Sequence, residues 1–341
     1  MPDVVVSVRD LQTTFHTKLG PVRAVDGISY EIGKGRTLGI VGESGCGKSV
    51  ASYSLMRLIE PPGEITGGEV RLHGEDLLAL PEERMADYRG SRMAMIFQEP
   101  MTALNPVLTI GYQMDEQIMR HKGLARKASR DRALEMLDRV GIPSPRERYD
   151  SYPHQLSGGM RQRAMIAMAL SCDPEFLIAD EPTTALDVTI QAQILDLLND
   201  LRRETGTSVI IITHDLGVVA ETADKVAVMY LGHIVEFGPA ECIYGPPYHP
   251  YTEALLSAVP IPDPTAVQKH IRLSGTVPSA LHPPSGCVFH TRCPRRSLLP
   301  DGGSICERET PPQRDNTPAH RIYCHVPLEE LRKMEPIITT D

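Results

Sequence analysis

One eight-residue segment constrains the fold of this chain more than any other feature. Residues 42–49 read Gly-Glu-Ser-Gly-Cys-Gly-Lys-Ser, which matches the pattern G-x-x-x-x-G-K-[ST] of a phosphate-binding loop. The glycines allow successive backbone N–H groups to turn inward around phosphate oxygens, and Lys48 and Ser49 are left for phosphate and Mg²⁺. Because such a loop joins a strand to a helix, the segment predicts an α/β fold with a phosphate site.

Four short apolar runs have the character of buried parallel strands, and each ends in a polar residue or a glycine. They cover residues 38–41, 93–97, 176–179 and 209–213, and they are followed by Gly42, Gln98, Asp180 and His214. In an open α/β sheet, ligands bind outside the carboxyl ends of the strands. The spacing therefore predicts that these four residues belong to one site.

The rest of the chain divides into two further regions. Residues 100–160 show helical periodicity between prolines, which predicts an inserted helical subdomain whose many charges form a solvated face. After Gly238-Pro239 the sequence becomes rich in proline and poor in strand patterns. We therefore expect a first domain over residues 1–238 and a C-terminal extension over residues 239–341.

The residues at the predicted strand ends suit phosphoryl transfer, which needs a metal ion, a positioned water and compensation of charge on the phosphate. Asp180 can accept Mg²⁺ and its waters, with Ser49 and Gln98 as further ligands. Glu181 can polarise the attacking water, and His214 can hold the phosphate and the water in line. Taken singly, these residues also suit a helix cap, a surface charge and a loop histidine; taken together after a phosphate loop, they indicate catalysis.

A second anion site is predicted at residues 156–159, Leu-Ser-Gly-Gly, which precede a helix with apolar periodicity. The Ser157 hydroxyl and the N–H groups of Gly158 and Gly159 lie at the positive end of that helix. Because a phosphate-loop enzyme that hydrolyses alone needs one such site, the simplest account is a head-to-tail dimer. Each chain's second site then closes on its partner's nucleotide.

Bulk properties exclude several classes of protein. The chain has 341 residues, of which 41% are hydrophobic, so it can form a real core. Its formal net charge of −9 gives no basic footprint for nucleic acid. No apolar run approaches the ~20 residues that span a bilayer. The sequence also starts without the pattern of a secretory signal, so we expect the seven cysteines to be in a reducing cytoplasm.

In this order, these motifs resemble the nucleotide-binding subunit of an ABC transporter over residues 4–238. The motifs are the phosphate loop, Gln98, the segment 156–159, Asp180-Glu181, Ala185-Leu-Asp187 and His214. Residues 98–106, residues 249–252 and the terminal cysteines resemble the dipeptide/oligopeptide (nickel) importer ATPases more narrowly. The resemblance implies a P-loop NTPase fold, with a RecA-like core, an N-terminal antiparallel β subdomain and the helical insertion.

The resemblance also implies function. ATP binding would close two such subunits, the second a paralogue, and drive two membrane permease subunits to release a solute delivered by an extracytoplasmic binding protein; hydrolysis would reset them. The chain would lie peripherally on the cytoplasmic face of the plasma membrane. Peptide is the expected cargo, while nickel, opines and oligosaccharides stay open. The alternative is a soluble ABC-type ATPase that acts on nucleic acid or ribosomes, but such proteins tend to carry two cassettes or a coiled-coil insertion.

By the resemblance, Lys48, Gln98, Glu181 and His214 are catalytic, and Ser49, Gln98 and Asp180 hold Mg²⁺. The ATP-binding residues would be Phe15, Gly42, Glu43, Ser44, Gly45, Cys46, Gly47, Lys48, Ser49, Ser157, Gly158, Gly159 and Asp187. Phe15 would stack on adenine, although a core phenylalanine suits the position as well. Residues 99–112 would receive a helix of a membrane subunit through Met101 and Leu104. Met160 departs from the usual glutamine of the family, and Gln162 matches it.

Four of the seven cysteines lie in the extension: Cys287, Cys293, Cys306 and Cys324. Four thiolates in a loop-rich segment suggest a metal that replaces a hydrophobic core. Both zinc and an iron–sulfur cluster accept four cysteines, and the spacing matches neither a zinc ribbon nor a ferredoxin pattern. The resemblance favours a [4Fe–4S] cluster, with zinc and plain thiols as alternatives and His290, His320 and His325 as spare ligands.

Overall fold

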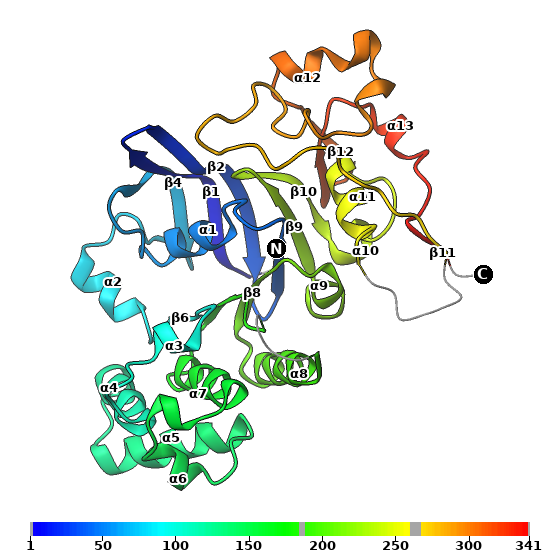
Figure 1. The fold of residues 1–341 in the computed structure, drawn as a ribbon. Coiled ribbons are helices and arrows are strands. Elements are labelled where there is room, and N and C mark those ends of the chain that lie inside the picture. The colour runs from blue at the N-terminus through cyan, green and yellow to red at the C-terminus, as the bar shows by residue number, and fades with distance from the viewer. Residues whose placement is uncertain (1–2, 184–187, 260–266, 340–341) are drawn as a thin grey trace. The chain divides into compact units, whose positions relative to one another are not determined.

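The computed structural model describes residues 3–183, 188–259 and 267–339 (Figure 1). The chain forms two compact units. The first unit comprises Met1–Ser7, Glu31–Thr37 and Arg71–Ile212, and the second comprises Val8–Tyr30, Leu38–Val70 and Thr213–Asp341. In the described ranges, no helix is both long and apolar enough to span a bilayer.

Three parallel strands organise the first unit: β6 (Met93–Ile96), β7 (Phe176–Asp180) and β8 (Ser208–Thr213). In their register Ile96 lies opposite Ala179, and Asp180 lies opposite Ile212. All three strands are buried along their whole length. This confirms the prediction of buried parallel strands from the apolar runs, since residues buried on both faces read as continuous apolar segments.

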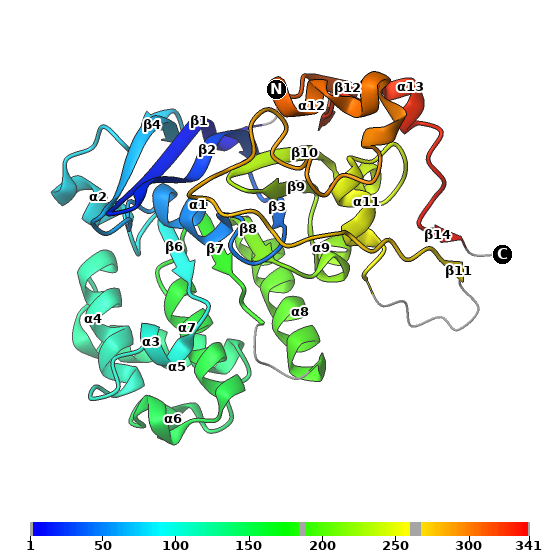
Figure 2. The same cartoon turned by 45° about the horizontal axis from the view of Figure 1, so that its top comes forward.

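The predicted helical insertion is also present in the first unit. Its main helices are α4 (Ile110–Lys122), α5 (Arg126–Arg139) and α7 (Gly158–Leu170), which lie side by side in both views (Figures 1 and 2). Thr109 caps α4, because its side chain accepts a hydrogen bond from the N–H of Tyr112, and Gly123 ends the helix with φ of 65°. The unit also holds β5 (Glu75–Asp76), α2 (Glu82–Tyr88), α3 (Pro100–Ala103), α6 (Pro145–Tyr149), the 3-10 helix η1 (Pro153–Gln155) and α8 (Val188–Thr205).

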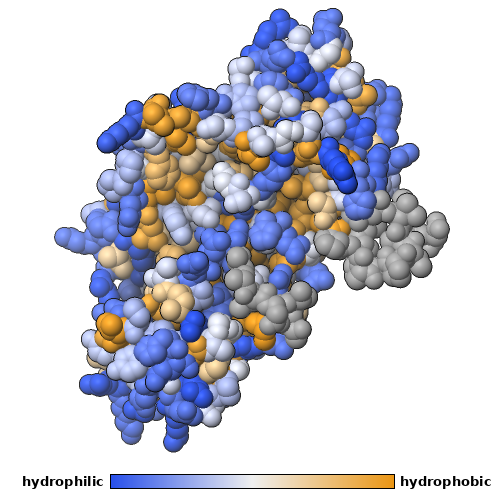
Figure 3. Space-filling model, viewed as in Figure 1, coloured by the Kyte–Doolittle hydropathy of each residue, from blue (hydrophilic) through white to orange (hydrophobic). Residues whose placement is uncertain are grey.

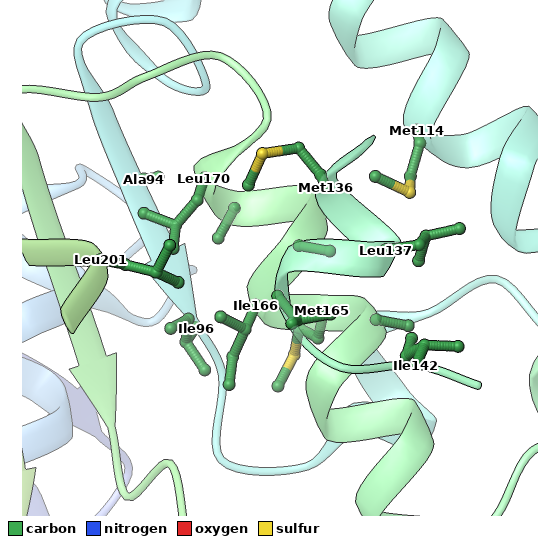
Figure 4. Packing of buried hydrophobic residues seen from close by; sticks show 14 of the residues in the cluster. Ala94, Ile96, Met114, Met136, Leu137, Ile142, Met165, Ile166, Leu170 and Leu201 are labelled. Atoms are coloured by element: carbon green, nitrogen blue, oxygen red, sulfur yellow. The ribbon is translucent and has the colours of Figure 1, made fainter. Parts of the chain in front are cut away.

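One hydrophobic core joins these helices to the strands. Side chains of α5, α7 and β6, including Leu137, Ile166 and Ile96, pack together with an exposed fraction of zero (Figure 4). Each such side chain contributes about 1.5–3 kcal/mol on burial. Their outward faces are charged, and the surface over α4 to α6 is mostly hydrophilic (Figure 3). The charges of α5 thus cover a solvated face, as the sequence predicts.

The second unit contains most of an N-terminal sheet with the order β2–β1–β4, formed by β1 (Val4–Thr17), β2 (Gly20–Gly33) and β4 (Gly63–Leu72). It also contains a second run of strands. Here β3 (Thr37–Val41) pairs in parallel with β9 (Lys225–Tyr230), and β10 (His233–Pro239) pairs antiparallel with β9. The C-terminal strand β13 (His320–Tyr323) pairs with β10, and β12 (Gln313–Thr317) pairs with β13. The C-terminal segment therefore continues this run of strands.

The remaining elements of the second unit are short. They are α1 (Lys48–Leu55), α9 (Leu216–Thr222), α10 (Ala240–Ile243), α11 (Pro250–Leu256), β11 (Val267–Gln268), the 3-10 helices η2 (Arg296–Leu298) and η3 (Pro300–Gly303), α12 (Ile305–Arg308), α13 (Leu328–Leu331) and β14 (Ile338–Thr339). One core includes Val41 of β3, Tyr230 of β9 and Phe289 of the C-terminal segment. The strand that leads into the phosphate loop and the C-terminal segment thus share a core.

Candidate active site

The phosphate loop lies in the second unit, between the end of β3 and the start of α1. A Cβ atom on Gly42 would lie 2.2 Å from the carbonyl oxygen of Met229, and one on Gly47 would lie 2.1 Å from that of Ala24. These two positions therefore require glycine, because the loop packs against neighbouring backbone. Gly45 has φ of +79°, and nothing lies within 4 Å of the place where its Cβ would be. The loop is thus packed tightly on one side and open at Gly45, as a cradle for a ligand requires.

Lys48 is held inside this loop, with an exposed fraction of only 5%. Its Nζ donates hydrogen bonds to the carbonyl oxygens of Gly42 at 2.8 Å and Glu43 at 3.1 Å. Both of these partners are neutral carbonyl oxygens, so these bonds do not neutralise the ammonium. Together with the open face at Gly45, this donor set fits the phosphates of a nucleotide. Cys46 is a small buried residue of the loop, and burial raises the pKa of its thiol.

In the first unit, the strand ends bring two of the predicted catalytic residues together. Asp180, the last residue of β7, is completely buried. Glu181 follows it with φ of +46°, and its N–H donates to the carbonyl oxygen of Ile212 at 2.9 Å. Gln98 Nε2 donates to Glu181 Oε2 at 3.0 Å. A left-handed backbone at a residue other than glycine costs about 1–3 kcal/mol and is concentrated at functional sites. Glu181 therefore has both the partner and the strained backbone typical of a catalytic carboxylate.

A third residue supports this turn. Gln162 of α7 is 3% exposed, and its Nε2 donates to the carbonyl oxygen of Pro182 at 2.6 Å. The bond fixes the residue directly after Glu181 to the helix that begins at the predicted second anion site. The sequence analysis matched Gln162 to the family pattern but gave it no structural role. Its partner lies 20 residues away in the sequence, so no local sequence pattern predicts this hydrogen bond.

The start of α7 is also as predicted in its local structure. Ser157 is the N-cap, and its Oγ accepts a hydrogen bond from the N–H of Met160 at 3.3 Å. A Cβ on Gly158 would meet nothing within 4 Å, whereas one on Gly159 would lie 3.3 Å from Ile190 Cγ2. The helix terminus therefore has open space at Gly158.

Comparison with known proteins identifies the family. Residues 25–184 match the model of the family described as ABC transporter, and residues 235–298 match that of the oligopeptide/dipeptide transporter, C-terminal region. The chain is 49% identical to the dipeptide transport ATP-binding protein DppD of Bacillus subtilis over 99% of this chain and 98% of that protein. It is 46% identical to the oligopeptide transport ATP-binding protein OppD of Salmonella typhimurium over 96% of each chain. The chain belongs to the family of ABC transporter ATP-binding proteins.

Solved structures of ABC transporter proteins support the fold. A dimeric ATP-binding cassette in a post-hydrolysis state, bound to ADP and Pi, matches with a TM-score of 0.63 and 26% sequence identity. The match covers 69% of this chain and 98% of the cassette. Because the phosphate-loop motif and this fold agree, the predicted P-loop NTPase fold is confirmed. An ABC transporter ATP-binding protein of this kind is an ATPase coupled to transport.

The other residues implied by the family resemblance differ in their exposure to solvent. His214, the residue after β8, is exposed, and Phe15 is half-buried in β1. Of the two predicted contacts to a membrane subunit, Met101 is 46% exposed, whereas Leu104 is only 2% exposed and belongs to the helical core. Leu104 is therefore a core residue and not a surface contact. Asp187 lies outside the described residues.

The prediction of a [4Fe–4S] cluster on Cys287, Cys293, Cys306 and Cys324 is wrong. In the part of the chain that the structure describes, no group of three or more histidine, cysteine, aspartate or glutamate side chains is placed to hold a metal ion. This finding removes the support for zinc as well.

The physical reason lies in the surroundings of the thiols. Cys287, Cys306 and Cys324 are buried in the apolar core of the second unit, and Cys293 packs against it. Burial raises the pKa of Cys287 to about 11 and that of Cys293 to about 12. In the structure these side chains therefore contribute to, or pack against, a hydrophobic core.

Proposed function

We propose that this chain is the ATP-binding and ATP-hydrolysing subunit of an importer of dipeptides or oligopeptides. The observation that carries the proposal is the extent of the similarity: relatives named as dipeptide and oligopeptide transport proteins match through residues 239–341 as well as through the ATPase motifs. We divide the chain accordingly into an ATPase domain, residues 1–238, and a peptide-importer extension, residues 239–341.

Each motif has a role in this proposal. The N–H groups of residues 42–49 and the Lys48 ammonium bind the phosphates of ATP, while Phe15 contacts the base. Ser49, Gln98 and Asp180 would hold Mg²⁺, which neutralises charge on the phosphates when bound. Glu181 accepts a proton from the attacking water, because it carries a carboxylate already oriented by Gln98.

His214 holds the water and the terminal phosphate in line in the proposed mechanism. Ser157, Gly158 and Gly159, together with Asp187, contact the nucleotide of a second ATPase subunit. The open space at Gly158 and the dimeric state of a similar cassette support this arrangement. We propose a paralogue as that second subunit, because the family resemblance favours a heterodimer.

Two membrane permease subunits and an extracytoplasmic binding protein complete the proposed importer, with this chain on the cytoplasmic face of the plasma membrane. Residues 99–112 are the proposed contact with a permease. Three apolar side chains there are exposed: Met101 at 46%, Val107 at 75% and Tyr112 at 54%. Isolated exposed apolar residues are ordinary, but a group within one segment suits a protein partner.

Two variants test the ATPase assignment. Lys48→Ala removes the buried ammonium, so ATP binding should be lost. Glu181→Gln keeps an acceptor for Gln98 but removes the base, so ATP should still bind while turnover falls by about 10²- to 10⁴-fold. Equilibrium ATP binding and steady-state hydrolysis are the measurements. Normal hydrolysis by Glu181→Gln would refute the assignment.

The cargo is tested in proteoliposomes that contain the complete transporter. ATP-dependent uptake of a labelled dipeptide, competed by unlabelled peptides and abolished by Glu181→Gln in this chain, is the expected result. Uptake of nickel or an oligosaccharide in place of peptide would contradict the proposed cargo while leaving the ATPase assignment intact.

A further inference from the structure

Two residues of the C-terminal extension contact the phosphate loop directly. Both bind Glu43, the second residue of the loop, and all of these residues belong to the second unit. The Glu43 N–H donates to the Tyr251 hydroxyl at 2.8 Å. The Arg292 guanidinium donates twice to the Glu43 carboxylate, from Nη1 to Oε2 at 2.7 Å and from Nη2 to Oε1 at 3.2 Å. With Lys48 on its carbonyl oxygen, Glu43 is held at its N–H, its carbonyl and its side chain.

Tyr251 and Arg292 are held in place by tight packing around them. Tyr251 is completely buried, and the Arg292 side chain is 9% exposed. The rings of Tyr230, Tyr251 and Phe289 contact one another at centroid distances of 4.8–5.3 Å. The Arg292 guanidinium lies 6.0 Å from the centroid of the Tyr230 ring. Buried, interlocking rings have few alternative rotamers, so the Tyr251 acceptor and the Arg292 donor are fixed before any ligand binds.

The charge of Glu43 makes the Arg292 contact important for a phosphate site. A carboxylate within a loop that binds a polyanion repels the ligand, and the repulsion grows as water is excluded. The Glu43 side chain is partly buried, with 27% exposed. A bidentate guanidinium cancels that charge and fixes the geometry of the carboxylate at the same time. The hydrogen bonds that Arg292 donates to Glu43 raise the pKa of the guanidinium further, so it stays charged.

We propose that Arg292 and Tyr251 make the C-terminal extension a positioning element of the nucleotide site. They hold Glu43 in place and neutralise its carboxylate, so that the loop keeps the conformation in which it accepts nucleotide phosphates. The inference deepens the proposed ATPase function and rests on it. It assigns to the extension a direct effect on ATP affinity, in addition to any part the extension plays in folding.

The central test is a rescue experiment with the full chain. Arg292→Met leaves the Glu43 carboxylate uncompensated, so the Kd for Mg-ATP should rise roughly tenfold, a typical loss on breaking a charge-assisted pair. KM should rise in parallel, while kcat at saturating ATP changes little. Adding Glu43→Gln to Arg292→Met removes the stranded charge and should restore most of the affinity. Arg292→Lys, which keeps the charge but lacks the fork, should lie in between.

Arg296→Met is the matched control, because Arg296 is also an arginine of the extension but donates to the Gly303 carbonyl and to Glu307. Its ATP affinity should equal that of the wild type. Tyr251→Phe provides an independent variant in case Arg292→Met folds poorly, since it removes one hydroxyl and keeps the ring. It should weaken ATP binding about threefold, a modest loss in keeping with a single neutral hydrogen bond.

Several results would overturn the inference. Wild-type ATP affinity in Arg292→Met, or in a folded Tyr251→Phe, would show that the contacts do not act on the loop. A double variant as weak as Arg292→Met alone, with a lowered melting temperature, would show that Arg292 acts only on stability. Failure of the proposed nucleotide site itself gives a different result, because Lys48→Ala would then bind ATP as the wild type does.

Discussion

The hydrogen bond from Gln162 to Pro182 gives a quantitative test of how the structure positions Glu181. Gln162→Met keeps the volume of the side chain and suits a helix, but it removes the donor. The carbonyl oxygen of Pro182 then loses its 2.6 Å partner in a buried place. Leaving a buried acceptor unsatisfied costs about 1–3 kcal/mol. The left-handed backbone at Glu181 costs a similar amount of free energy. Without the hydrogen bond that offsets this cost, the turn can relax to a less strained conformation.

The kinetic consequence follows from the size of this term. A tenfold change in rate corresponds to about 1.4 kcal/mol of activation free energy. If the whole loss of about 1–3 kcal/mol raises the activation barrier, kcat should fall by roughly 5- to 150-fold. KM for ATP should stay near the wild-type value, because the lost bond lies at the turn after β7 and not in the phosphate loop. The assay is steady-state ATP hydrolysis with thermal unfolding measured on the same preparation.

Gln193→Met is the control for this substitution. Gln193 is an exposed glutamine of α8 that accepts a hydrogen bond from Arg163 Nη2 at 2.8 Å, so its loss should change neither kcat nor stability by much. An unchanged kcat in Gln162→Met, with or without a lower melting temperature, would refute the positioning role. So would a rise in KM at constant kcat.

Three further predictions concern packing, the second anion site and pH. Gly111→Ala places a Cβ 2.4 Å from the Tyr149 ring, so thermal or urea unfolding should show a loss of about 1–3 kcal/mol. Gly158→Ala adds a Cβ where nothing lies within 4 Å, so its melting temperature should be unchanged while ATP hydrolysis is lost; full hydrolysis would argue against contact with a second subunit. Burial raises the pKa of Glu236, so the folded state binds this proton more tightly than the unfolded state. Stability should therefore fall as pH rises from about 4.3 through the folded pKa, and urea midpoints of Glu236→Gln should show a smaller decline.

The part of the site that follows the strands could be predicted from the sequence. Gln98 and Glu181 come directly after apolar runs, and parallel strands bring such ends to one edge. The structure accordingly places Gln98 Nε2 3.0 Å from Glu181 Oε2. The strain at Glu181 could not be predicted, because a positive φ at a residue other than glycine depends on tertiary contacts and not on local preference.

The extension was harder to predict for a physical reason. The sequence shows four cysteines in a proline-rich, loop-rich segment with little apolar content, which suggested a segment that needs a metal to fold. In the structure the apolar residues of this segment join the core of Val41 and Tyr230, and β13 pairs with β10 while β12 pairs with β13. A core supplied by another part of the chain removes the need for a metal. Glu43 and Arg292 lie 249 residues apart. The phosphate-loop pattern does not specify the residue type at position 43, and Arg292 belongs to no motif.

The extension also supplies contacts to strand β10 of the proposed ATPase domain. The edge of β10 is covered by β13, where Glu236 lies opposite Ile322. The buried Glu236 carboxylate accepts hydrogen bonds from His320 and from the N–H of His249, both at 2.8 Å. Without the extension, β10 would present an open edge and Glu236 would lose its partners. The Glu43 carboxylate would also be stranded in the phosphate loop. The extension therefore covers the edge of β10 and, through Tyr251 and Arg292, also contacts the phosphate loop.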